Sequence, residues 1–222
     1  MSTPLPQLPA GIGDRFATEV LLVRHARSED VVPGSPESYD PQLHAEGVVQ
    51  ARALADRLRA KRIHAVYVSD LLRTQQTAEP VLAGRGIEPT IVPDLREVNL
   101  GEWEGGGMRR AAAEQGPDWQ RFVAAGSWDV IPGAEPDGFL RRRTIDAIDG
   151  IAATHEGQTV LVVSHGGAIN AYLAETLGVE RTFFTTIENA SITLLRYGGR
   201  RRMVVTLNDC HHLYDPVLGR PG

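Results

Sequence analysis

This 222-residue chain has few cysteines, no long apolar run and no excess of basic residues, and each of these limits the functions that it can have. It contains one cysteine, Cys210, which excludes an internal disulfide framework and favours a reducing, cytoplasmic compartment. It contains no apolar run of about 18 residues, so no membrane-spanning segment is expected. Basic residues are not in excess, since the formal net charge is -5. A nucleic-acid partner would need a basic surface, so neither nucleic acid nor membrane is an expected partner.

The two ends of the chain lack the pattern of regular elements. Residues 1–18 contain prolines and glycines but no basic segment followed by an apolar one, so we expect a flexible leader rather than a secretion signal. Residues 210–222 are expected to form a C-terminal tail. Residues 19–209 suffice for one α/β domain with a substantial core, and no repeat or linker divides them.

Predicted strands and helices alternate along residues 19–209. Short apolar runs predict buried strands at 20–23, 65–69, 90–92 and 159–164. Helical spacing or composition predicts helices at 46–60, 70–82, 111–125, 137–155 and 168–177, with the helical stretch 111–125 interrupted near Gly116-Pro117. Ser69 or Asp70 is expected to cap the second helix, and residues 191–207 predict a hairpin around Gly198-Gly199. The alternation indicates an α/β protein whose mostly parallel sheet is covered on both faces.

The segment with the clearest chemistry is Arg24-His25-Ala26-Arg27-Ser28, directly after the strand at 20–23. Ligands of open α/β sheets bind outside the carboxyl ends of the strands. Guanidinium groups bind phosphate oxygens through paired hydrogen bonds, and nearby cations disfavour protonation of an imidazole. His25 beside Arg24 is therefore suited to attack on phosphorus.

A second segment repeats this arrangement. The strand at 159–164 is followed by His165-Gly166-Gly167 and then by a predicted helix. A strand, a glycine turn and a helix N-terminus together direct backbone N–H groups toward an anion. Two histidines in matching positions predict one shared phosphate site.

These segments resemble those of the histidine phosphatase superfamily, the phosphoglycerate mutase-like proteins. Residues 22–28 are similar to its Arg-His-Gly signature, and residues 163–167 to its second histidine motif. Residues 43–51, 69–78 and 95–105 are similar to three further family segments, in family order. The resemblance implies a three-layer α/β/α sandwich with one antiparallel strand in the sheet. It also implies a cap-like insertion over about residues 98–138.

The resemblance also implies a mechanism without a metal or other cofactor. His25 would attack the phosphorus and form a phosphohistidine, and Glu97 would protonate the leaving alcohol and then activate water. The implied catalytic residues are His25, Glu97, His165, Arg24 and Arg73. The implied substrate-binding residues are Arg24, Arg27, Ser28, Arg73, His165 and Gly166.

Three positions depart from the family pattern. Ala26 replaces a glycine, and Val31 stands where many members have an asparagine that contacts the phosphoryl group. Arg27 replaces an acidic or amide residue. Its side chain could extend the positive pocket toward a second anionic group, or it could point to solvent, and both alternatives stay open.

The leading hypothesis is a phosphomonoesterase acting on a small phosphorylated metabolite. A phosphoglycerate mutase-type phosphotransferase is the first alternative, because a phosphohistidine can return its phosphate to another hydroxyl. A phospho-ligand-binding module with little turnover is the second. A homodimer is compatible with the sequence, which assigns no interface. The aromatic side chains near 103, 119, 122 and 128 could stack on a substrate or fill the cap core.

A metal site at Asp209-Cys210-His211-His212 is disfavoured by its lack of a second, spaced pair of ligands.

Overall fold

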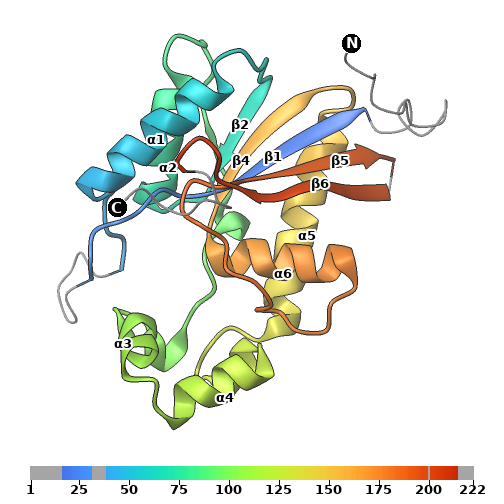
Figure 1. Ribbon diagram of the computed structural model, residues 1–222. Coiled ribbons are helices and arrows are strands. Elements are labelled where there is room, and N and C mark those ends of the chain that lie inside the picture. Colours follow the sequence, from blue (N-terminus) through green and yellow to red (C-terminus); the bar gives the residue numbers. More distant parts are fainter. Residues whose placement is uncertain (1–16, 32–38, 200, 215–222) are drawn as a thin grey trace, which may run out of the picture.

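The computed structural model describes residues 17–31, 39–199 and 201–214 (Figure 1). Within these residues the strands form a six-stranded sheet in the order β3-β2-β4-β1-β5-β6. The strands are β1 (Thr18–Arg24), β2 (Ala65–Val68), β3 (Thr90–Ile91), β4 (Thr159–Ser164), β5 (Ile192–Gly198) and β6 (Arg201–Asp209). Strand β5 pairs antiparallel with both β1 and β6, while the other pairings are parallel. The expected mostly parallel sheet with one antiparallel strand is confirmed.

Two helices cover each face of the sheet (Figure 1). Helices α1 (Ala45–Leu58) and α2 (Leu72–Leu82) pack on one face, and α5 (Asp137–Thr154) and α6 (Gly166–Leu177) on the other. Successive side chains of a strand point to opposite faces. Accordingly, Leu21 of β1 packs in the cluster beneath α1 and α2, whereas Leu22 packs in the cluster beneath α5 and α6. The three-layer α/β/α sandwich is thus confirmed.

Strands β1 and β4 meet at the point where the chain changes direction across the sheet. They lie side by side in parallel, with Arg24 in register with Ser164. The chain leaves β1 toward α1 on one face and leaves β4 toward α6 on the other. Such a switch point opens a crevice at the carboxyl ends of the two strands, where ligands of α/β sheets bind.

The segment that we call the cap, residues 98–138, lies apart from the sheet (Figure 1). It contains α3 (Gly107–Glu114), α4 (Pro117–Ala125) and the short 3-10 helices η4 (Gly101–Trp103) and η5 (Trp128–Val130). Phe122 and Trp128 are buried in a third apolar cluster, which also includes Leu140 of α5 and Ala171 of α6. The rings of Trp103 and Trp119 pack against Phe122. Most of the cap aromatics therefore form its core, as one of the two alternatives predicts.

The start of α2 differs from the prediction. The N-cap residue is Leu71, which makes no side-chain capping bond, and neither Ser69 nor Asp70 caps the helix. Instead the carboxylate of Asp40 accepts a hydrogen bond from the N–H of Leu72, at 2.9 Å. Asp40 lies 32 residues earlier in the chain, so no local capping pattern could show this contact.

The two ends of the chain are described in part. Residues 1–16 of the expected leader and residues 215–222 of the expected tail lie outside the described residues. Thr18 already belongs to β1. Cys210 is buried, and Leu213 packs against a small apolar cluster that includes Ala26. Residues 210–214 therefore pack on the domain. No helix in the described part of the chain has the length and apolar character needed to cross a membrane.

Candidate active site

His25 follows β1 at the switch point and has a defined tautomer. Its Nδ1 lies 2.7 Å from the carbonyl oxygen of Ala26. A carbonyl only accepts, so Nδ1 carries the proton and Nε2 keeps its lone pair. Nε2 in turn accepts a hydrogen bond from Nε of Arg73, at 3.3 Å. Burial, followed by the charges of Arg73 and Arg24, lowers the pKa of His25 well below its usual range, which keeps the ring neutral.

His165 follows β4 and lies beside His25, with 5.0 Å between the ring centroids. Its Nε2 is 2.8 Å from the hydroxyl oxygen of Ser69, which follows β2. Burial, then the charge of Arg73, lowers the pKa of His165 well below its usual range. Both strand-end histidines are therefore neutral and close together, although they are far apart in the sequence.

Two arginines complete the positive side of the site. Arg24 ends β1 and donates from Nη1 to the carbonyl oxygen of Ile187. Arg73 lies in the first turn of α2, 3.6 Å from the carboxylate of Asp40. Seven buried side-chain N or O atoms of the described residues have no hydrogen-bond partner, and three of them are Arg24 Nε, Arg73 Nη1 and His165 Nδ1. Because these three belong to residues beside His25 and two are guanidinium nitrogens, the group is suited to bind an anion.

Glu97 contacts the N-terminus of α6. Its carboxylate accepts hydrogen bonds from the N–H groups of Gly167 at 3.3 Å and Ala168 at 3.1 Å. A Cβ atom at Gly167 would lie 2.6 Å from Oε1 of Glu97, so the glycine permits this approach. The helix N-terminus was expected to direct N–H groups near Gly166 toward phosphate. These two N–H groups instead bind the carboxylate, because a helix N-terminus favours any nearby anion.

Three predicted substrate-binding residues remain, namely Ser28, Gly166 and Arg27, and they differ in where they lie relative to the cleft. Ser28 is buried and lines the cleft. Gly166 lies against Arg24, since a Cβ atom there would be 3.5 Å from the Arg24 Nε. Arg27 pairs with Glu46 on α1 and is not among the residues that line the cleft. The structure therefore favours the solvent-facing alternative for Arg27.

The sequence analysis missed several residues that line the cleft, among them the cationic Arg96, Arg109 and Arg143. Arg109, on α3 of the cap, lines the cleft and pairs with Asp30, which follows the first histidine motif. Its charge contributes to the lowered pKa of His25. The one signal in the sequence was the Arg109-Arg110 pair after the glycines at 105–107, and nothing local showed that this pair would face the histidines.

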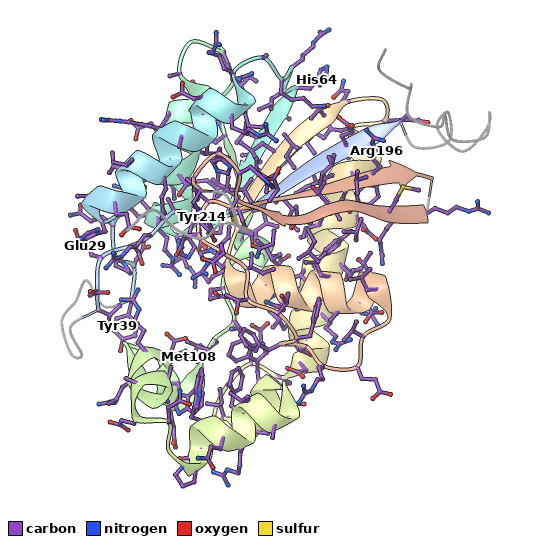
Figure 2. All side chains as sticks on the ribbon, in the orientation of Figure 1. Glu29, Tyr39, His64, Met108, Arg196 and Tyr214 are labelled. Atoms are coloured by element: carbon purple, nitrogen blue, oxygen red, sulfur yellow. The ribbon has the colours of Figure 1, made fainter. Side chains whose placement is uncertain are left out.

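The cleft between the sheet and the cap has a volume of about 760 Å³. Tyr39, which follows the first histidine motif, and Met108, on α3 of the cap, both line the cleft and are labelled in Figure 2. Small-molecule sites typically measure about 300–1,000 Å³. The cationic side chains that line the cleft are Arg24, Arg73, Arg96, Arg109 and Arg143.

A metal site is not formed within residues 17–31, 39–199 and 201–214, where no three His, Cys, Asp or Glu side chains are grouped to share an ion. In the segment 209–212, Asp209 pairs with Arg57 and His211. His212 contacts the carbonyl oxygen of Ala190.

A neutral imidazole at a sheet switch point, with two buried guanidinium groups and a carboxylate nearby, defines an α/β protein built for phosphoryl chemistry. The family model for the histidine phosphatase superfamily (branch 1) matches residues 20–210. The chain therefore belongs to this superfamily. It is a phosphoric monoester hydrolase by class.

Three known proteins show the range of the similarity. A metal-independent phosphoserine phosphatase from Arabidopsis thaliana is 32% identical over 202 residues, which cover 88% of this chain and 83% of the plant protein. A probable phosphoglycerate mutase from Yersinia enterocolitica is 34% identical over 165 residues, which cover 72% of this chain and 75% of that protein. The solved structure of Bacillus stearothermophilus YhfR is 27% identical and has a TM-score of 0.77, covering 88% of this chain and 99% of that one.

Proposed function

We propose that this chain hydrolyses small phosphomonoesters through a phosphohistidine on Nε2 of His25. The observation that carries the proposal is the set of three buried nitrogen atoms that have no hydrogen-bond partner and lie beside a neutral imidazole. These atoms, Arg24 Nε, Arg73 Nη1 and His165 Nδ1, would bind the non-bridging oxygens of a phosphoryl group. They would stabilise the charge on these oxygens in the transition state.

The first chemical step transfers the phosphoryl group to the enzyme. The lone pair on Nε2 of His25 forms an N–P bond while the bond between phosphorus and the leaving oxygen breaks. Glu97, in its protonated form, gives its proton to that oxygen, and the alcohol departs. The N–H groups of Gly167 and Ala168 then stabilise the carboxylate that remains.

The second step releases phosphate. Water attacks phosphorus, the Glu97 carboxylate takes a proton from the water, and the N–P bond breaks. The bonding pair returns to Nε2 of His25, which is again a neutral base. The enzyme regains its starting protonation, and one molecule of water is consumed for each ester hydrolysed.

The substrate class that we propose is a small phosphorylated metabolite with a second anionic group, with phosphoserine as the first compound to test. The plant relative is named for phosphoserine. Arg96 and Arg109 also line the cleft, where they pair with Asp70 and Asp30, so a second anionic group would bind by replacing one of these carboxylates. The Yersinia relative is named as a probable mutase, so 3-phosphoglycerate belongs in the same test.

The test is phosphate release from para-nitrophenyl phosphate, phosphoserine, 3-phosphoglycerate and a wider metabolite panel in EDTA. We expect release to survive the chelator and to fall at least about 10³-fold in His25→Ala. Rapid acid-free quenching with labelled substrate should capture a phosphohistidine in the wild type alone. Release that the mutation leaves unchanged would contradict the mechanism.

The mutase alternative is tested with 3-phosphoglycerate in the presence of 2,3-bisphosphoglycerate. We expect inorganic phosphate to form faster than 2-phosphoglycerate. Isomerisation that outpaces phosphate release would favour the mutase. Binding of phosphorylated ligands without release from any of them would favour the binding module.

A further inference from the structure

The loop that carries Glu97 is held by an arginine of another element. This loop, residues 93–97, follows β3 and includes the 3-10 helix η3 (Pro93–Leu95). Nη1 of Arg143, on α5, donates to the carbonyl oxygens of Asp94 and Arg96, each at 2.8 Å. Its Nη2 donates to the carbonyl oxygen of Glu97 itself, at 3.1 Å. One guanidinium group therefore holds three carbonyls in four residues.

Arg143 is itself fixed by a second residue. Glu135, at the end of the cap, accepts from Nε of Arg143 at 2.7 Å and from Nη2 at 2.8 Å. Their side chains are only 19% and 17% exposed, respectively. The backbone N–H of Glu135 also donates to the carbonyl oxygen of Asn99, just beyond the loop. Paired hydrogen bonds between a guanidinium and a carboxylate are strong and directional, so this pair forms a rigid support.

Two other contacts also hold the loop in place. The hydroxyl of Ser164, at the end of β4, donates to the carbonyl oxygen of Leu95 at 2.7 Å. The Glu97 carboxylate rests on the first turn of α6. Arg143, which also lines the cleft, supplies a further support through the three backbone carbonyls. Without it, three carbonyls lose their donor and the main chain at Glu97 is free to shift.

We propose that Arg143 is a positioning residue, whose guanidinium aims the Glu97 carboxylate at the leaving oxygen of the substrate. The inference rests on the proposed role of Glu97 as the general acid. Proton transfer requires the two heavy atoms to be within about 2.6–3.2 Å, so a small displacement of the loop impairs this step selectively. A displaced acid matters most when the leaving group is a strong base, because a weakly basic one departs without a proton.

The test compares kcat/KM for phenyl phosphate and para-nitrophenyl phosphate. The two esters are similar in size, but phenolate is a stronger base than para-nitrophenolate and depends more on the acid. The ratio kcat/KM covers the steps up to departure of the leaving group, so a slow second step does not mask the difference. The variants are Arg143→Gln and, as the reference for loss of the acid, Glu97→Gln.

The matched control is Arg141→Gln, on the same helix. Arg141 also donates to backbone carbonyls, those of Val179 and Glu180, and it pairs with Glu175. These contacts support the loop after α6 rather than the loop of Glu97. The control therefore removes a similar set of hydrogen bonds without touching the acid.

We expect Arg143→Gln to lower kcat/KM for phenyl phosphate about tenfold more than for para-nitrophenyl phosphate. Glu97→Gln should show a larger selective loss, within the roughly 10²–10⁴-fold range of general acid catalysis. Arg141→Gln should change both esters equally. Equal losses for both esters in Arg143→Gln would overturn the inference, because lost structure or lost positive charge near His165 would affect both alike.

The two proposals fail in distinguishable ways. If Glu97→Gln shows the selective loss and Arg143→Gln does not, only the positioning role fails. If Glu97→Gln itself shows no selective loss, the acid assignment fails and the positioning role fails with it. Should Arg143→Gln not fold, Arg143→Lys is measured instead. This variant keeps the charge but not the planar fork, and the same selective loss is expected at a smaller size.

Discussion

The hydroxyl oxygen of Ser69 lies 2.8 Å from Nε2 of His165, and both residues are fully buried. If the hydroxyl donates to Nε2, the remaining ring proton is on Nδ1, the buried atom that has no partner among the described residues. The Ser69 hydroxyl also lies 3.0 Å from Oγ1 of Thr74 and accepts from the N–H of Leu71, so it joins the ring of His165 to the start of α2. We expect this contact to hold the ring of His165 in place for a bound phosphoryl group.

Replacing Ser69 with alanine should lower kcat/KM about tenfold. The reason is the loss of the hydrogen bond that holds the ring of His165, together with the contacts of the same hydroxyl to Thr74 and Leu71 at the start of α2. A buried hydrogen bond contributes about 1–2 kcal/mol. The matched control is Ser191→Ala, because the Ser191 hydroxyl is buried and has no hydrogen-bond partner in the described chain. Equal activities for the two variants would contradict the role of Ser69.

Replacing Arg73 with alanine should lower kcat/KM far more than replacing Arg27 with alanine. Arg73 is mostly buried and contacts Nε2 of His25, so its loss should lower kcat/KM by about 10²–10³-fold. Arg27 pairs with Glu46 outside the cleft lining, so its loss should change kcat/KM less than about twofold. A large effect of Arg27→Ala on a substrate with two anionic groups would instead place Arg27 at the second group.

Gly167→Ala should impair both stability and activity. The added Cβ would lie 2.6 Å from Oε1 of Glu97 and 2.9 Å from Cγ1 of Val98, so the carboxylate must leave the helix N-terminus. We expect a lower melting temperature and a loss of kcat/KM of at least about tenfold. Gly150→Ala, inside α5, is the matched control, because its Cβ would meet nothing within 4 Å.

The control should behave in the opposite way. Alanine is favoured over glycine in a helix interior by about 1 kcal/mol, so Gly150→Ala should raise the melting temperature and leave activity unchanged. If Gly167→Ala were as stable and as active as Gly150→Ala, the close contact with Glu97 would not exist in solution.

Below about pH 6.5, the free energy of unfolding should decrease as the pH is lowered. Folding lowers the pKa values of His25 and His165 well below the usual range, so both stay neutral in the folded protein. In the unfolded chain they titrate near pH 6.5, and below that pH the unfolded state binds more protons. Above that pH both states are neutral, and these residues contribute no pH dependence.

Urea unfolding at a series of pH values measures this effect. Each histidine contributes a slope of up to about 1.4 kcal/mol per pH unit between its unfolded and folded pKa values. His25→Asn should reduce the slope below pH 6.5 by up to that amount and leave the dependence above it unchanged. A slope that is the same in both proteins would show that His25 is charged in the folded state.

The sequence predicted the parts of the fold and site that depend on local pattern. His25 and His165 each follow an apolar strand, and parallel strands end at the same edge of a sheet, so their proximity could be expected. The three layers followed from the alternation of strands and helices. The sequence also shows a glycine in the first turn of α6, but it does not show that the Glu97 carboxylate binds there.

The sequence did not predict the contacts that join distant segments. Ser69 was interpreted as a helix cap, whereas its partner His165 lies 96 residues later. Arg143 is not among the site residues predicted from the sequence, and its partners are carbonyls 46 to 49 residues earlier. Such contacts depend on how helices pack on the sheet, which no local spacing records.

The apolar cluster between the cap and helices α5 and α6 has a consequence for how substrate preference can change. The residues proposed to act on phosphorus come from the ends of β1 and β4 and from α2, whereas Trp103, Met108 and Arg109 come from the cap. Because Phe122 and Trp128 anchor the cap on Leu140 of α5 and Ala171 of α6, cleft-facing side chains of the cap can be exchanged while this anchor is retained. Substitutions at such cleft-facing positions are therefore the expected route to a different leaving group.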